Sequence, residues 1–253
     1  SKVPPPTTTS EPLRVPPSSM PHDFPPPPLP PPPDELNIGD LTRARAFLGF
    51  QPRNTHQEST RYLLGTVAGH AIIDPEETLY SLRKVLQFVK KVSYSGGTFL
   101  FVSSQPQLAR LTRVLGEKTG HYSLVKKWIP GLLTNWEQTR KSVRARQNVE
   151  QIAQKSGRLR QSDLLRAIDY KGIDKMVRPP DVIVRLDSTN LQGEPAAKCI
   201  PVVSVVDTSQ HGREVDYPIP ANANSIRFYH TLSYLLVRSI KEGAELRGDL
   251  ERF

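Results

Sequence analysis

The sequence predicts an α/β fold in which a parallel, doubly wound sheet is flanked by helices, and three observations support this class. Apolar runs of strand length alternate with amphipathic helical segments along most of the chain. One of these runs, residues 99–102, has no polar alternation, which is typical of a strand covered on both faces. The segments between the runs are long enough for helical crossovers, so we expect βαβ units and a parallel, doubly wound sheet.

The first long helix is expected to begin after a short strand end at residues 71–73. Asp74 suits the N-cap, Pro75 the first helical position, and Glu77 the third position, where its carboxylate can complete a capping box. The apolar positions recur at spacings of three and four: Leu79, Leu82, Leu86 and Val89. This periodicity places one face in the core. The cations of the segment should stay in solvent: Arg83, Lys84, Lys90 and Lys91.

The remaining elements follow in alternating order. Gly96 and Gly97 form a helix-to-strand turn before the strand at residues 99–102. Further segments are a helix at 105–120, a strand around 121–125, a basic helical region after Leu132, strands within 180–187 and 200–207, and a closing helix from about Asn224. Gly243 stands where a C-cap would end that last helix.

The N-terminal region differs in composition from the rest of the chain. About fifteen of the 25 prolines precede residue 34, in runs that favour extended polyproline II over a packed element. We therefore expect a disordered or extended proline-rich extension at residues 1–39 and a folded α/β domain at 40–253. Within that domain, residues 137–180 are interpreted as a basic helical insertion.

The chain carries a net charge of +9 and has an isoelectric point of about 9.7. The excess lies in the middle, because residues 40–136 have 13 basic and 6 acidic side chains and residues 137–180 have 11 and 5. Such a region is the electrostatic footprint expected for a polyanion, since each phosphate contact releases counterions. The alternative interpretation is a solvated surface that keeps the protein soluble.

Several classes of protein and site are disfavoured. No stretch approaches the roughly 20 apolar residues of a membrane helix, and the chain opens on no recognisable secretory signal, so we expect a soluble protein. No Cys/His spacing resembles a zinc site, and no metal or cofactor is expected. Cys199 is the only cysteine and is interpreted as a small buried apolar residue.

An enzyme that binds a dinucleotide or flavin is the first hypothesis for a doubly wound sheet. Its fingerprint is missing, because the loop after residues 99–102 reads SSQPQ and lacks the glycines that let a backbone approach a pyrophosphate. Asp187 and Asp207 close two consecutive strands and could hold a cation or act as acid and base. No nucleophile or metal cluster accompanies them, and Asp207 is interpreted as a turn residue that bonds nearby amides.

The stretch KKWIPGLLTNW, residues 126–136, contains both tryptophans. Packing in the core explains the two indole rings, Trp128 and Trp136, without any ligand. The polar groups around them differ, because short hydrogen-bonding side chains and cations gather at one loop and helix start. Such a mixture is suited to gripping sugar and phosphate oxygens.

These residues also resemble a known family. WIPGLLTNW is similar to the Trp-Leu-Gly-Gly-x-Leu-Thr-Asn-Trp signature of the ribosomal protein S2 family, and four further stretches match its motifs in order: YLLG with HAIIDPEETL, GGTFLFVSS, PPDVIVRLD, and IPVVSVVDTSQHGREVDYPIPANANSIR. The resemblance covers about residues 47–243. It implies a flavodoxin-like sheet with an α-helical hairpin, no catalysis, and a structural role at the junction of head and body of the small ribosomal subunit.

The resemblance also implies partners and a site. The partners are small-subunit ribosomal RNA and neighbouring ribosomal proteins, with no membrane and no homo-oligomer. The residues that we expect to bind RNA are Lys126, Lys127, Trp128, Thr134, Asn135, Arg140, Lys141, Arg144, Arg53, Arg61 and Arg227.

Three features depart from bacterial members of the family. The insertion at 137–180 is shorter than their helical hairpin, STNLQGEPAAK is a poor helix, and bacterial relatives lack the proline-rich extension. A basic, diverged member with an added tail indicates an organellar ribosome, mitochondrial in preference to plastid. The alternative from another class is an adaptor whose polyproline tail binds proline-reading domains.

Overall fold

A computed structural model describes residues 35–125, 127–143, 172–209 and 214–250. Its elements are, in order, α1 (Ile38–Arg43), η1 (Pro52–Asn54), η2 (Gln57–Tyr62), β1 (Leu63–Val67), β2 (His70–Ile73), α2 (Pro75–Tyr94), β3 (Phe99–Ser103), α3 (Pro106–Thr119), β4 (Tyr122–Val125), β5 (Val182–Arg185), α6 (Glu194–Ala197), β6 (Val202–Val206), β7 (Tyr217–Pro220) and α7 (Ile226–Leu250). Residues 136–143 are also helical. The helical hairpin expected within 137–180 falls largely outside the described residues.

The central sheet has five parallel strands in the order β4-β3-β5-β6-β7. Counted from β3, this order is 2-1-3-4-5, the flavodoxin-like arrangement, so the predicted fold class is confirmed. The strands expected around β3, β4, β5 and β6 all form. Strand β7 was not predicted, because Pro218 and Pro220 argue against a central strand. Both prolines are tolerated there because β7 lies at the edge of the sheet.

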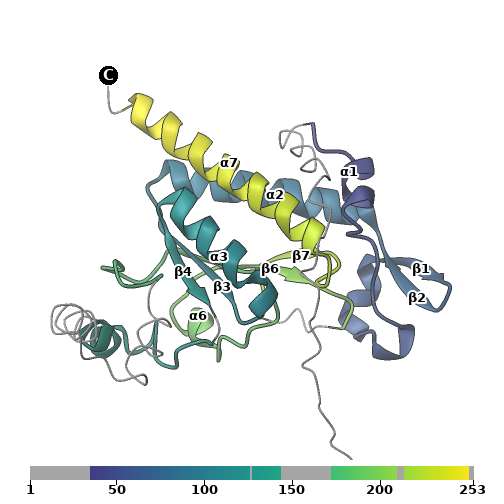
Figure 1. Cartoon of the computed structure of the whole chain (residues 1–253), viewed down its shortest axis with the longest axis horizontal. Helices are drawn as coiled ribbons and strands as arrows, with labels where there is room; N and C mark the ends of the chain where they lie inside the picture. Colours follow the sequence, from purple (N-terminus) through teal and green to yellow (C-terminus); the bar gives the residue numbers. More distant parts are fainter. Residues whose placement is uncertain (1–34, 126, 144–171, 210–213, 251–253) are drawn as a thin grey trace, which may run out of the picture.

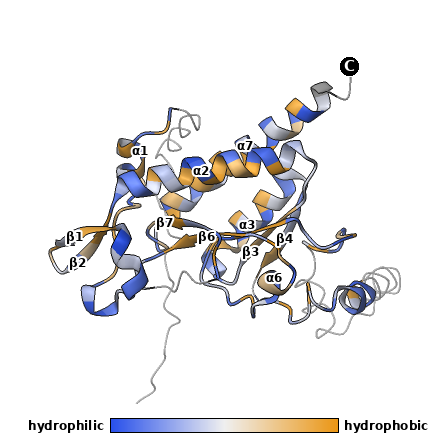
Figure 2. Cartoon of the chain, turned by 180° about the vertical axis from the view of Figure 1, so that it is seen from behind, coloured by the Kyte–Doolittle hydropathy of each residue, from blue (hydrophilic) through white to orange (hydrophobic). Residues whose placement is uncertain are grey.

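The sheet separates two hydrophobic clusters, and Figures 1 and 2 show helices on both of its faces. Phe99 and Phe101 of β3 face the cluster formed with α1, α2, α3 and α7. Leu100 and Val102 face the opposite cluster, which includes the residues that follow β4. Successive side chains of a strand point to opposite faces, so an unbroken apolar run serves both layers. Among the described helices, none combines the length and apolar character that a membrane span requires.

The two long helices, α2 and α7, pack side by side on one face of the sheet (Figure 1). The expectation that Gly243 caps the end of the last helix was wrong, because α7 continues to Leu250. A Cβ atom at Gly243 would lie 2.4 Å from the carbonyl oxygen of Lys90 on α2. Ser93 Oγ also donates a hydrogen bond of 2.6 Å to Ile240 O at this crossing. Gly243 is therefore required for close helix packing.

The start of α2 agrees with the sequence prediction in most respects. Asp74 accepts a hydrogen bond of 2.8 Å from Glu76 N and so caps the helix. The Asp74 N–H donates instead to Tyr62 O at 2.8 Å, so the predicted capping box with Glu77 does not form. After the helix, Gly96 adopts a φ of +74°, as the turn before β3 requires.

A small antiparallel hairpin, β1 with β2, was not predicted beyond a short strand end. The segment before it is fixed to the end of β6. His56 N donates to Thr208 O at 2.7 Å, and Phe50 N donates to Thr208 Oγ1 at 2.9 Å. These contacts place η1 and η2 beside the carboxyl edge of the sheet, close to the hairpin (Figure 1).

Candidate nucleic-acid interface

The loop that follows β4 is organised around one buried carboxylate, that of Glu194. Its Oε1 atom accepts a hydrogen bond from Trp128 Nε1 at 3.0 Å and another from Gly131 N at 2.8 Å. Its Oε2 atom accepts from Leu133 N at 2.9 Å and from Thr134, through N at 3.1 Å and Oγ1 at 3.2 Å. Five donors from the WIPGLLTN stretch therefore converge on one side chain.

Glu194 is 5% exposed and is the first residue of the short helix α6. Burial acts to raise the pKa of Glu194, but the hydrogen bonds from Trp128 and from the backbone of Leu133, Thr134 and Gly131 outweigh it, so the pKa lies below its ordinary value. The side chain is therefore an ionised carboxylate at neutral pH. It joins α6 to the loop, residues 127–135, across more than sixty residues of sequence.

The role of Glu194 was not predicted from the sequence. The segment around α6 was expected to be a poor helix, and that helix is only four residues long. One signal was present, because Pro130-Gly131 followed by a helix start turns several backbone N–H groups to one side. Gly131 has a φ of +79°, which favours glycine. Such a loop needs an acceptor, but sequence spacing does not indicate which distant carboxylate supplies it.

Two predicted RNA-binding residues are used inside the protein. Trp128 is 3% exposed and its indole N–H is bonded to Glu194, so its ring is part of the core and is not offered to RNA. Thr134 is exposed, yet both its N–H and its hydroxyl donate to Glu194. Trp136, interpreted as a core anchor, is partly buried against the cluster that includes Trp128 and Leu132. The main role of the WIPGLLTN stretch within the protein is therefore to fix the loop to α6 through Glu194.

The remaining polar groups of this region form the loop surface, which we define as Lys127, Asn135 and Lys141. All three side chains are exposed. Arg140 is half-buried, and its NH2 atom forms an ion pair of 2.9 Å with Glu137 Oε2. The structure thus leaves two cations and an amide exposed between the end of β4 and residue 141. Lys126 and Arg144, also predicted to bind RNA, lie outside the described residues.

Three further arginines that were predicted to bind RNA lie on other elements of the fold. Arg53, on η1, donates from Nε to Gln51 Oε1 at 2.9 Å. Arg61, on η2, lies 4.6 Å from the ring centre of Tyr62, and Arg227 is exposed on the first turn of α7. The η1–η2 segment and residues 136–143 lie at opposite ends of the molecule in Figure 1. Arg53 and Arg61 therefore do not belong to the loop surface.

The crevice between β3 and β5, where flavodoxin-like folds bind nucleotides, is filled by Asp187. Its Oδ2 atom accepts hydrogen bonds from Ser104 N at 2.6 Å and from Gln105 N at 2.9 Å, just before α3. Ser103 Oγ and Ser104 Oγ donate to the same oxygen, and Thr189 donates to Oδ1 through N and Oγ1. An internal carboxylate thus occupies the helix N-terminus that would receive a phosphate.

Asp207, at the end of β6, is also satisfied internally. Its Oδ1 atom accepts from Thr208 N at 2.6 Å and its Oδ2 atom from Ala223 N at 2.8 Å, so the predicted turn is confirmed. Burial raises the pKa of Asp207 despite these hydrogen bonds. Neither strand-end aspartate presents a side chain to solvent, since each is 1% exposed. Within the described ranges, no group of three His, Cys, Asp or Glu is placed to hold a metal ion.

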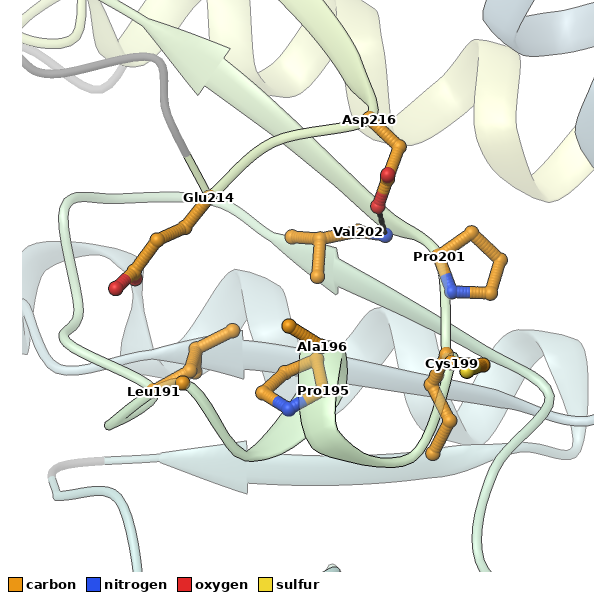
Figure 3. Close-up of a pocket in the computed structure, with 10 residues that line it drawn as sticks. Leu191, Pro195, Ala196, Cys199, Pro201, Val202, Glu214 and Asp216 are labelled. Atoms are coloured by element: carbon orange, nitrogen blue, oxygen red, sulfur yellow. Dashed lines mark hydrogen bonds between the residues drawn. The ribbon is translucent and has the colours of Figure 1, made fainter.

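A pocket of about 370 Å³ lies on the other side of α6, between that helix, β6 and the segment before β7 (Figure 3). Glu214 and Asp216 stand at one side, and Asp216 Oδ2 accepts from Val202 N at 2.8 Å. Cys199 also lines the pocket. The expectation that Cys199 is buried was wrong: it is exposed and has a φ of +53°, because the chain turns sharply between α6 and β6.

Comparison with known proteins identifies the family of this chain. The family model for Ribosomal protein S2 matches residues 41–243. The small ribosomal subunit protein uS2 of Acidobacterium capsulatum is 30% identical over 228 residues, covering 85% of this chain and 75% of its own. The uS2c protein of Rhodomonas salina is 30% identical over 223 residues, covering 82% and 91%. The uS2 protein of Synechocystis sp. is 28% identical over 228 residues, covering 85% of each. The chain therefore belongs to the ribosomal protein S2 family.

Proposed function

We propose that this protein is a structural component of the small ribosomal subunit and binds small-subunit ribosomal RNA through the loop surface, Lys127, Asn135 and Lys141. One observation carries the proposal: the exposed Lys127 and Asn135 stand on a loop that five hydrogen bonds to Glu194 hold in place, and the exposed Lys141 stands on the helical residues that follow it. Family membership supplies the ribosomal context.

The loop surface has the chemistry that an RNA backbone requires. Lys127 and Lys141 can neutralise phosphates, and the Asn135 amide can donate to and accept from sugar and phosphate oxygens. A loop that is already fixed loses little conformational entropy on binding, so more of the contact energy appears as affinity. Burial of Trp128 and partial burial of Trp136 support this fixed geometry.

We further propose a mitochondrial ribosome as the setting, with neighbouring small-subunit proteins at the junction of head and body as partners. The support is the basic middle of the chain together with the proline-rich N-terminal segment, which we propose to be an extension outside the folded domain. The boundary expected at residue 40 is a few residues too late, because Leu36 is buried in the core and Asn37 caps α1. The S2 family assignment does not favour an adaptor built on polyproline recognition. We propose no catalytic role, because Asp187 and Asp207 are both occupied by internal donors.

A salt series tests the RNA-binding proposal. The wild-type chain should bind small-subunit ribosomal RNA with an affinity that falls steeply as salt rises, because phosphate contacts release counterions. Replacing Lys127 and Lys141 together by alanine should weaken binding and lower the slope of log K against log salt by about 2. The measurement is equilibrium binding at several salt concentrations.

The matched control replaces Lys118 and Lys241, which are exposed on α3 and α7, by alanine. It removes the same charge and should leave the slope much closer to wild type. An equal effect of the two double variants would show that net charge alone drives binding. A wild-type affinity that does not change with salt would contradict the proposal outright.

A further inference from the structure

The solvent face of α2 carries an ordered stripe that the loop surface does not explain. The α2 stripe consists of Tyr80, Lys84, Gln87, Lys91 and Tyr94, and every one of these side chains is exposed. At about 100° per residue they fall within an arc of about 80° and extend over about 21 Å of helix. The buried residues of α2 lie on the opposite side: Thr78, Leu82, Val85, Leu86, Val89 and Ser93.

The stripe is positively charged without nearby compensation on its own helix. The acidic residues of α2, Glu76 and Glu77, are confined to the first turn, where they favour the positive helix end. From residue 78 to residue 94 the helix has four basic and no acidic residues. One of the four, Lys90, is paired with Glu242 of α7 at 3.0 Å. Lys91 forms no ion pair with any residue that the structure describes.

Two tyrosines bracket these cations. Tyr80 is 67% exposed and Tyr94 is 43% exposed, so a large part of each residue is open to solvent. A third ring, Tyr217 of β7, stacks on Phe88 with ring centres 4.1 Å apart, and Lys84 Nζ lies 5.9 Å from the centre of Tyr217. Tyr80 and Tyr94 are not members of the hydrophobic core cluster on which α2 packs, so their rings remain available for a partner.

We propose that the α2 stripe is a second RNA-binding surface, which contacts phosphates through Lys84 and Lys91 and stacks unpaired bases on Tyr80 and Tyr94. Aromatic rings interleaved with cations form the platform that single-stranded nucleic acid binds, because every base has a face that can stack. An acidic protein is the less suitable occupant, since lysine is depleted at protein–protein interfaces. The inference rests on the proposed ribosomal function.

The two surfaces lie on different sides of the molecule. Helix α2 packs on the cluster that contains Phe99 and Phe101, whereas Trp128 and Leu132 of the loop pack on the other cluster. Figure 1 shows α2 on one side of the sheet and residues 136–143 on the other. One continuous RNA contact of a few nucleotides cannot reach both. The protein would therefore join two separate RNA segments.

The test uses the full chain and small-subunit ribosomal RNA as the probe. Replacing Tyr80, Lys84 and Lys91 by alanine should lower the affinity at least about fivefold and reduce the salt slope by about 2. The control replaces Lys118 and Lys198, which are exposed on α3 and after α6, and should leave the affinity within about twofold. Thermal unfolding of both variants should match wild type, because the changed side chains are exposed.

A single variant, Tyr80→Phe, isolates the stacking contribution because it keeps the ring and all charges. It should bind like wild type, whereas Tyr80→Ala should bind more weakly with an unchanged salt slope. Ultraviolet crosslinking of assembled small subunits should leave a nucleotide on the peptide that contains Tyr80 or Tyr94.

The possible outcomes separate this inference from the proposed function. If the α2 variant binds RNA like wild type while the Lys127 and Lys141 variant is weakened, the inference is wrong and the proposed function stands. If neither variant is weakened, the proposed function fails first. Recovery of the α2 peptide crosslinked to a protein and never to a nucleotide would also overturn the inference.

Discussion

Replacing Glu194 by alanine should unfold the loop that presents the proposed RNA contacts. Two of its donors, Trp128 Nε1 and Leu133 N, are buried. Each buried donor left without a partner costs about 1–3 kcal/mol, so the variant should lose about 2–6 kcal/mol of the free energy of unfolding. Denaturant unfolding measures this loss. Hydrogen exchange should accelerate at Gly131 and Thr134, whose amides are also released.

Glu194→Gln is the matched control, since it keeps the size of the side chain and one acceptor oxygen. The glutamine NH2 group would replace one carboxylate oxygen and would face donors that now bond to that oxygen. We therefore expect a loss of unfolding free energy between zero and that of the alanine variant. Unchanged stability of the alanine variant would contradict the assignment of Glu194 as the organiser of the loop. RNA binding by the folded fraction of the glutamine variant should weaken, although the side chain itself is 5% exposed.

The free energy of unfolding of wild type, compared with that of Glu194→Gln, should depend on pH with a defined sign. The pKa of Glu194 is lower in the folded protein than its ordinary value, so the unfolded chain binds the proton more readily. The stability that the carboxylate contributes is therefore fully present above the unfolded pKa of about 4.3 and is lost as pH falls through the folded pKa. Asp207 acts in the opposite direction, because burial raises its pKa. The difference between wild type and Glu194→Gln isolates Glu194 and should shrink below about pH 4.3.

Replacing Asp187 by alanine should have the second large effect, at the crevice between β3 and β5. The amides of Ser104 and Gln105 would lose their acceptor at the start of α3, and the buried amide of Thr189 would lose its own. A lost helix cap costs about 1 kcal/mol and a buried unpaired amide about 1–3 kcal/mol, which gives about 2–4 kcal/mol in all. Thermal unfolding is the measurement.

Hydrogen exchange should show that Asp187→Ala and Glu194→Ala destabilise different parts of the structure. In Asp187→Ala, hydrogen exchange should accelerate at Ser104, Gln105 and the first turn of α3, while Gly131 and Thr134 keep their protection. Asp187→Asn, which retains one acceptor, should be less destabilised than the alanine variant. A variant as stable as wild type would mean that Asp187 does not hold the start of α3.

The fold class could be predicted from local sequence patterns, whereas the hydrogen bonds between Glu194 and the loop could not. Residues 99–102 predicted a doubly covered strand because burial on both faces removes polar alternation, and the structure places Phe99 and Leu100 in opposite clusters. Glu194 could not be paired with Trp128 from sequence, because the contact joins segments 66 residues apart. The prediction that both indoles pack in the core was right for Trp128 and in part for Trp136, but it did not identify the carboxylate that bonds Trp128.

Other differences have equally local causes. A glycine near the end of an amphipathic helix predicts a C-cap, but Gly243 instead admits the carbonyl oxygen of Lys90 from the neighbouring helix. Strand β7 was not predicted because it contains Pro218 and Pro220, which only an edge strand tolerates. A sequence alone does not show which strand will lie at the edge of the sheet. Lys84 and Lys91 of α2 were correctly expected in solvent, whereas Lys90 is partly buried and pairs with Glu242 of α7. The alignment of Lys84 and Lys91 with Tyr80 and Tyr94 became apparent only from the exposure of both rings.

The most direct test of the central claim is the sedimentation of the native chain and of a variant in which Lys127, Asn135 and Lys141 are replaced by alanine. Wild-type protein should sediment with the small ribosomal subunit and leave that fraction after ribonuclease treatment. The triple variant should keep its unfolding temperature, because its side chains are exposed and contribute little internally. It should nevertheless be depleted from the subunit fraction, whereas the control with Lys118 and Lys241 replaced should not be. Incorporation of the triple variant at the wild-type level would contradict the claim that the loop surface binds ribosomal RNA.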